Sequence, residues 1–283
     1  MSNTTLRESS GYLALCLWCK NENRYLREWI DYHLLLGVDH IFVIDNNSDI
    51  PLANEVSDYI DRGIVTLETD ASVFYRRQCV AYARSITRLH NRFRWLGFFD
   101  TDEFVVPKNG QLLPAFLRNY ESCGGLGVFW HCFGSNGHLR RQPSVLEAFT
   151  KRSASDFGPN THIKSFVNTE FVAHIAPPNP HCFRYRGGRP CVDENGEPIV
   201  GPMRQPRTSA LIQLNHYFLR SAEDWEEKLQ RGGGNSTTRR SKDYFTLNDR
   251  ECNAIEDRSA LDLRAALILR AASLSPPCLP CER

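Results

Sequence analysis

The chain has 283 residues, enough for one large α/β domain or for a domain with a small appendage. Hydrophobic residues make up 41% and charged residues 24%, and the formal net charge is +1. This is the composition of an ordinary globular protein, and the missing basic excess argues against a nucleic-acid partner.

The sequence contains no run of the ~20 apolar residues that a membrane-spanning helix needs. Residues 1–10 are polar and lack the apolar core of a signal peptide. We therefore expect a cytoplasmic protein without a transmembrane segment, and peripheral contact with a membrane stays open.

Apolar runs and helical patterns alternate along the first hundred residues. We expect strands over residues 12–19, 40–44, 64–67 and 95–99. We expect helices between them, one ending at Gly37 and others over residues 51–61 and 77–90. This alternation predicts βαβ units and a doubly wound sheet. Ligands of such sheets bind beyond the carboxyl ends of the strands, where polar clusters stand at residues 20–23, 45–49 and 100–103.

The second half of the sequence is less regular. We expect a short helix over residues 111–120, a strand over 126–130, a strand over 210–214 and helices over 221–231 and 259–272. Residues 131–209 contain many Gly, Pro, His and Arg residues and are expected to form irregular loops that could line a binding site. These patterns suggest one domain over residues 10–245 and a C-terminal helical tail over 246–283.

An acidic motif directly follows the fourth expected strand. Asp100, Asp102 and Glu103 come after four apolar residues, and residues 104–107 are apolar again. Carboxylate oxygens are the ligands that hard divalent cations prefer, and such a cation can bridge a diphosphate at the same time. The alternative is a solvated acidic turn, but the apolar segments on both sides favour a metal site.

This motif makes the sequence similar to a known family. The segments Asp100-Thr101-Asp102-Glu103-Phe104 and Asn215-His216-Tyr217 are the most specific, and residues 17–22, 42–48 and 133–138 match as well. They occur in the order found in GT-A glycosyltransferases, and the chain resembles the family 2-like and family 92-like branch over about residues 10–235. The resemblance implies an α/β, Rossmann-like fold with a mixed, mainly parallel sheet flanked by helices and an irregular acceptor-side region.

The same resemblance implies a metal-dependent hexosyltransferase. It would move a hexose from a nucleotide-sugar donor, expected to be a UDP-sugar, to a glycan or glycoconjugate acceptor in polysaccharide biosynthesis. Mn²⁺ or Mg²⁺ would offset the charge of the departing diphosphate. A catalytically inactive carbohydrate- or partner-binding protein on the same scaffold is the alternative, and the presence of Asp100, Asp102 and His216 together argues against it.

The resemblance also implies roles for single residues. Asp102 and His216 would be metal ligands, and Asp100 would reach the metal or the donor ribose through water. Asp45 would bind the uracil edge, and Glu22 lies where the loop after the first strand meets the nucleotide. Each has a structural alternative: an Asx turn for Asp45, a backbone hydrogen bond for His216 and helix-dipole stabilisation for Glu22.

Charge suggests the remaining candidates. Lys164, Lys228 and Arg231 could stabilise the leaving diphosphate, although basic residues on a helix face are usually only solvated. An inverting enzyme also needs a carboxylate that takes the proton of the acceptor hydroxyl. Asp156 and Glu170 lie in the region expected to face the acceptor, and the sequence does not choose between them.

Overall fold

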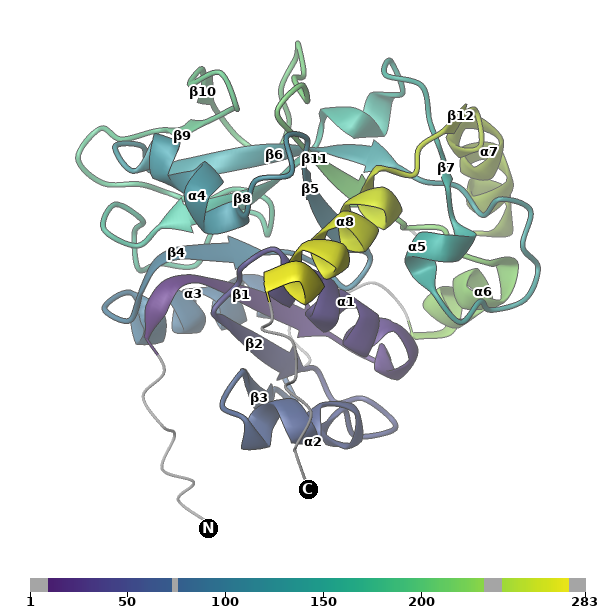
Figure 1. The fold of residues 1–283 in the computed structure, drawn as a ribbon, viewed down its shortest axis with the longest axis horizontal. Helices are drawn as coiled ribbons and strands as arrows, with labels where there is room; N and C mark the ends of the chain where they lie inside the picture. The colour runs from purple at the N-terminus through teal and green to yellow at the C-terminus, as the bar shows by residue number, and fades with distance from the viewer. Residues whose placement is uncertain (1–9, 73–75, 232–240, 275–283) are drawn as a thin grey trace, which may run out of the picture.

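The computed structural model describes residues 10–72, 76–231 and 241–274. Its centre is a ten-stranded sheet with the order β10-β9-β6-β8-β4-β1-β2-β3, and β11 pairs with β6 and with β5 beside this path (Figure 1). Parallel and antiparallel pairs both occur, and helices flank the sheet. The α/β class expected from the sequence is therefore confirmed.

The first hundred residues build one half of the sheet. Their elements are β1 (Gly11–Cys19), α1 (Asn23–Leu35), β2 (His40–Asp45), α2 (Ala53–Asp61), β3 (Val65–Thr69), α3 (Arg77–Leu89) and β4 (Phe93–Phe98). Strands β1 to β4 pair only in parallel with one another. This is the βαβ arrangement that the alternating pattern predicts.

The rest of the chain completes the sheet and adds small elements around it. They are β5 (Glu103–Pro107), α4 (Leu113–Leu117), a 3₁₀ helix (Arg118–Tyr120), β6 (Gly125–Cys132), α5 (Val145–Ala148), β7 (Lys151–Arg152), a 3₁₀ helix (Gly158–Thr161), β8 (Ile163–Asn168), β9 (Cys191–Val192), β10 (Pro198–Ile199), β11 (Ile212–His216), α6 (Ala222–Arg231), α7 (Lys242–Cys252), β12 (Ile255–Glu256) and α8 (Ser259–Leu274). Among the described helices, none is long and apolar enough to cross a membrane.

Strand β1 shows why its sequence is apolar without a break. Leu13, Leu15 and Leu17 join the core formed with α1, α2 and α8, whereas Ala14 and Cys16 join a second core formed with α3. Successive side chains of a strand point to opposite faces, so a strand covered on both sides needs apolar residues at every position.

The region between β6 and β11 contains a strand that the sequence pattern does not predict. Strand β8 lies between β4 and β6 and pairs antiparallel with both. All six of its residues are buried, yet Lys164, Ser165 and Asn168 are polar. These polar residues interrupt the apolar pattern because they bond to other parts of the chain instead of to water.

The register of the strands brings the predicted polar segments to one edge. Because β1, β2 and β4 run parallel, the residues that follow them meet at the same edge of the sheet. Strand β11 pairs antiparallel with β5, and this pairing sets His216 opposite Glu103. A histidine late in the chain is thus placed beside the acidic turn.

The described residues after 245 form most of α7, the short strand β12 and α8, and they pack against the rest of the fold. The boundary expected at residue 245 falls inside α7, and α8 lies against α1 (Figure 1). Asp249 of α7 accepts hydrogen bonds from the backbone and side chain of Ser135, at 2.6 and 2.9 Å. Arg264 of α8 donates to Glu28 of α1 at 3.3 Å.

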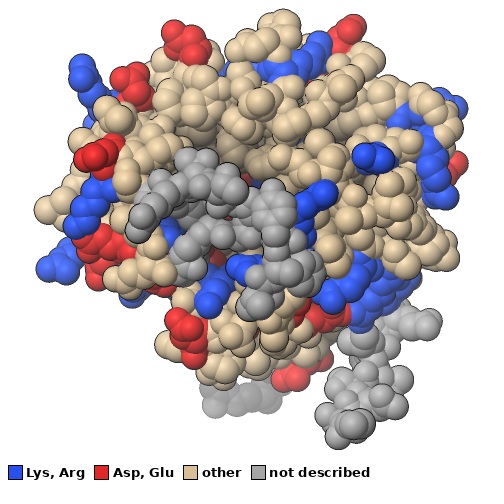
Figure 2. Space-filling model, turned by 180° about the vertical axis from the view of Figure 1, so that it is seen from behind, with Lys and Arg blue, Asp and Glu red and all other residues tan. Residues whose placement is uncertain are grey.

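The face seen in Figure 2 shows Lys and Arg side chains interspersed with Asp and Glu side chains.

Candidate active site

The turn after β4 holds Asp100 against a fully buried lysine. Lys164 of β8 lies 2.8 Å from Asp100 Oδ2 and 3.2 Å from Glu103 Oε2. The backbone N–H of Asp100 donates to Glu103 Oε2 at 2.8 Å, and Gln78 of α3 donates to Asp100 Oδ1 at 3.2 Å. The Asp100 carboxylate is therefore oriented from two elements, β8 and α3, while its side chain stays 36% exposed.

Glu103 is a buried residue to which the sequence reasoning gave no role. Its Oε1 accepts a 2.8 Å hydrogen bond from the indole N–H of Trp130. Burial, together with the nearby charges of Asp100 and Asp102, raises the pKa of Glu103, although Lys164 opposes this shift. The sequence contains one signal of this burial: Glu103 lies between two apolar segments, where a side chain is seldom solvated.

Asp102 is held by a lysine on one oxygen and faces a histidine with the other. Lys228 Nζ lies 2.6 Å from Asp102 Oδ2 and also donates to the carbonyl of Phe218 at 2.7 Å. His216 Nε2 lies 3.7 Å from Asp102 Oδ1. Burial disfavours the ionised carboxylate, but the charges of Lys228 and Arg220 outweigh it and hold the pKa of Asp102 well below its usual range.

His216 presents a neutral imidazole at this position. Burial lowers the pKa of His216 to about 3, so the ring is uncharged at neutral pH. Its centroid lies 4.1 Å from that of Trp130, and its buried Nδ1 has no hydrogen-bond partner among the described residues. The alternative role considered from the sequence, a hydrogen bond from the His216 ring to the backbone, is therefore not seen for Nδ1 among the described residues.

The described side chains at the acidic turn supply two suitable ligands for a divalent cation, but not a complete ligand set. Within residues 10–72, 76–231 and 241–274, no group of three or more His, Cys, Asp or Glu side chains is arranged to hold a metal ion. Asp102 Oδ1 and His216 Nε2 are a suitable pair of ligands, since Mg²⁺ and Mn²⁺ are commonly held by one or two side chains together with substrate phosphates and water. Asp100 does not join this pair, because its carboxylate is turned toward Lys164.

A cavity of about 350 Å³ lies beside these two groups. Most of its lining side chains are aromatic rings, imidazoles or charged groups. The lining residues within the described part of the chain are Asp100, Asp102, Trp130, Cys132, Pro159, His181, His216, Phe218, Trp225, Lys228 and Tyr244. The volume lies in the range of pockets that hold small molecules.

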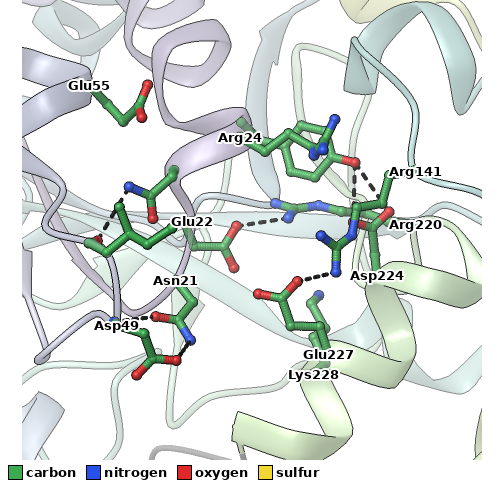
Figure 3. Close-up of a pocket in the computed structure, with 13 residues that line it drawn as sticks. Asn21, Glu22, Arg24, Asp49, Glu55, Arg141, Arg220, Asp224, Glu227 and Lys228 are labelled. Atoms are coloured by element: carbon green, nitrogen blue, oxygen red, sulfur yellow. Dashed lines mark hydrogen bonds and ion pairs between the residues drawn. The ribbon is translucent and has the colours of Figure 1, made fainter.

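A second cavity, of about 520 Å³, is lined by residues at the start of α1 and by α6 (Figure 3). Glu22 forms a buried ion pair with Arg220 there, at 2.7 Å. Arg220 also donates to the carbonyl of Thr101 at 3.1 Å, and its backbone has a φ of 52°, a left-handed conformation that is uncommon for a non-glycine residue. Glu22 is thus bound to Arg220, and its side chain forms no capping hydrogen bond with α1. Lys228 lines both cavities.

Asp45 is buried at the carboxyl end of β2. The backbone N–H and the hydroxyl of Ser48 both donate to its Oδ1, at 2.9 and 2.6 Å. This is the turn contact that the sequence left open as an alternative. Both contacts from Ser48 fall on Oδ1, and a nucleotide role for Asp45 stays a prediction.

The structure places the two candidates for a catalytic base away from Asp102. Glu170 follows β8, which runs antiparallel to β4, so it lies at the opposite edge of the sheet and pairs with Arg94. Asp156 is exposed on a loop and lines neither of the two cavities. Neither carboxylate is brought to Asp102. Arg231 ends α6, and its side chain lies outside the described residues.

A mixed sheet with an acidic turn after one parallel strand and a histidine at the end of a later strand defines a protein of the GT-A class. Residues 14–242 match the model of glycosyltransferase family 92, and the chain belongs to that family.

The chain is 31% identical to a glycosyltransferase family 92 protein of Oryza sativa subsp. japonica over 231 residues, which are 80% of this chain and 36% of that protein. A family 92 protein of Arabidopsis thaliana is 28% identical over 232 residues, 77% of this chain and 37% of the relative. The chain thus spans little more than a third of the length of these relatives.

Solved structures are more distant. TarS 1–349 of S. aureus gives a TM-score of 0.41 with 12% identity, covering 94% of this chain and 73% of that one. Glucosyl-3-phosphoglycerate synthase from Mycobacterium tuberculosis, in complex with Mn²⁺, UDP and glucosyl-3-phosphoglycerate, gives 0.28 with 17% identity, covering 42% and 44%. Similarity at this level carries no argument about activity.

Proposed function

We propose that this protein is a hexosyltransferase that uses a UDP-sugar and a glycan or glycoconjugate acceptor in polysaccharide biosynthesis, with Mn²⁺ or Mg²⁺ assisting the departure of UDP. One observation carries the proposal: Asp102 and His216, from distant parts of the chain, face each other 3.7 Å apart at the carboxyl edge of the sheet. Membership of glycosyltransferase family 92 supports glycosyl transfer.

Negative charge develops on the diphosphate as the anomeric bond breaks, and positive groups fixed nearby stabilise it. Lys228 supplies such a charge at the acidic turn, since its ammonium group bonds Asp102 and the carbonyl of Phe218. Lys164 is buried against Asp100 and Glu103, so it orients Asp100. Asp102 Oδ1 and His216 Nε2 would hold a divalent cation, which supplies Lewis-acid stabilisation of the diphosphate when bound.

Calorimetric titration with UDP tests the proposal. We expect UDP to bind at least about tenfold more tightly with Mg²⁺ or Mn²⁺ than with a chelator, and His216→Ala to lose most of this difference. His90→Ala, at the end of α3, is the matched control and should keep the full difference in UDP affinity between metal and chelator. Equal UDP affinity in chelator and in metal would remove the cation from the proposal.

Turnover distinguishes an enzyme from the alternative, an inactive binding protein. An active enzyme should release UDP slowly from a UDP-hexose even without an acceptor, and His216→Ala should lower that rate. If the folded protein binds UDP but releases none from any UDP-hexose offered, the inactive binding protein is the better description.

A further inference from the structure

The match to the family ends at residue 242, just where α7 begins. Tyr244, in the first turn of α7, nevertheless lines the same cavity as Asp102 and His216. A side chain outside the matched region therefore contributes to the wall of the candidate active site.

The position of α7 is fixed at both of its ends. At the amino end, the Ser241 hydroxyl accepts from the N–H of Tyr244 at 3.0 Å, and the indole N–H of Trp225 donates to the Ser241 carbonyl at 3.1 Å. At the carboxyl end, Asp249 accepts two hydrogen bonds from Ser135, and the Asn253 side chain accepts one from the backbone of Asn136. Because both ends of α7 are bonded to the rest of the fold, the position of Tyr244 at the cavity wall is fixed.

The cavity is rich in rings. The rings of Trp225 and Tyr244 are nearly parallel, with centroids 5.7 Å apart and an interplanar angle of 6°. The ring-bearing side chains that line the cavity are Trp130, His181, His216, Phe218, Trp225 and Tyr244. Aromatic faces pack well against the C–H face of a pyranose ring, and a few carboxylates or imidazoles beside them can bond its hydroxyl groups.

The carboxylates that line the cavity are each paired with an ammonium group. Asp100 is paired with Lys164, and Asp102 is paired with Lys228. Apart from the groups assigned to the cation and the diphosphate, the described wall of the cavity is mostly aromatic, which suits a neutral ring. A volume of about 350 Å³ leaves room for a single sugar ring with some solvent.

We propose that this cavity takes a neutral pyranose at the end of the acceptor, and that Tyr244 of α7 is one of the residues that recognise it. The inference rests on the proposed function, since it takes the cavity beside Asp102 as the acceptor side of the transferase. It also gives the C-terminal segment a part in substrate recognition.

Saturation-transfer NMR on the full chain tests the inference with the methyl glycosides of glucose, galactose and mannose as probes, each in the presence of UDP and Mg²⁺. We expect at least one glycoside to show saturation transfer with the wild type. Tyr244→Ala should reduce it by about fivefold or more, since stacked rings contribute about 1 kcal/mol or more. Tyr244→Phe, which keeps the ring, should largely restore it.

Leu247→Ala is the matched control, because Leu247 lies on the same helix, is 69% exposed and does not line the cavity. It should bind the glycosides like the wild type, and the thermal midpoints of all variants show whether α7 stays in place. No saturation transfer from the wild type to any of the glycosides, or equal transfer from Tyr244→Ala, would overturn the inference. The proposed function fails separately, through the UDP titration, so the two outcomes are distinguishable.

Discussion

The ammonium group of Lys228 lies 2.6 Å from Oδ2 of Asp102, and the two residues are 126 positions apart in the chain. This contact joins α6 to the turn after β4 and leaves Oδ1 of Asp102 facing His216. Lys228 is only 5% exposed, so the pair is largely shielded from water.

Replacement of Lys228 by methionine should damage both stability and turnover. Lys228→Met leaves the Asp102 carboxylate buried without its cation, and we expect a loss of about 3 kcal/mol in the free energy of unfolding. UDP release from a UDP-sugar should fall at least about tenfold, because positive charge at the diphosphate is lost. Lys242→Met is the control: Lys242 is 77% exposed in its pair with Glu226 and should change stability by less than about 1 kcal/mol. Wild-type turnover in Lys228→Met would contradict the role given to this lysine.

The two interpretations of Asp45 can be separated by a pair of variants. Asp45→Asn keeps an oxygen for the bonds from Ser48 but removes the charge, and we expect UDP affinity to fall by about tenfold. Ser48→Ala loses the 2.6 Å hydroxyl bond and should lower stability by about 1 kcal/mol with little change in UDP affinity. Calorimetry and thermal unfolding measure the two effects. If both variants lose only stability, Asp45 serves the turn alone.

Neutralising the two base candidates, Glu170 and Asp156, should leave catalysis intact. Glu170→Gln breaks the pair with Arg94, which is partly exposed, and we expect a stability loss of no more than about 1 kcal/mol. Turnover of a UDP-sugar should match the wild type, because Glu170 lies at the opposite edge of the sheet from Asp102. Asp156→Asn, on its exposed loop, should behave in the same way. A large drop in turnover for either variant would return that carboxylate to the list of candidate bases.

Asp257 offers a pH-dependent test of how the C-terminal segment is anchored. Its carboxylate accepts hydrogen bonds from Arg152 at 2.7 Å and from the N–H of Ser259 at 3.0 Å. Burial opposes ionisation, but the bonds from Ser259, Arg152 and Gln213 prevail and lower the pKa of Asp257 from 3.8 to about 2. The folded state therefore binds this proton less readily than the unfolded chain does. The resulting stability, about 2 kcal/mol, is present above pH 3.8 and is lost as the pH falls toward 2.

Asp257→Asn should accordingly be less stable than the wild type at neutral pH, and the difference should shrink as the pH falls from 3.8 toward 2. Denaturant unfolding at a series of pH values measures it. Glu256→Gln is the control, since Glu256 is exposed beside Asp257. A stability difference that does not change with pH would show that the charge of Asp257 does not anchor this segment.

The sequence by itself determined the elements of the first half and the place of the acidic turn. Alternating apolar runs and helical patterns give β1 to β4 and the helices between them, because such periodicity depends only on residues close in the chain. The start of α6 is also set by residues close in the chain: Ser221 and Asp224 bond each other there through the Ser221 hydroxyl. Residues that follow parallel strands must lie at one edge, so Asp45 and Asp100 were placed correctly at that edge.

Only the tertiary structure decided which side chains meet there. The sequence pattern of β8 predicts an irregular segment, because three of its six buried residues are polar. In the structure, β8 places Lys164 beside Asp100, and its direction places Glu170 at the opposite edge of the sheet. The register of β11 on β5 sets His216 beside the turn, and α7 brings Tyr244 to the cavity. Strand order, register and helix docking depend on contacts between segments far apart in the chain, and local periodicity contains no information about them.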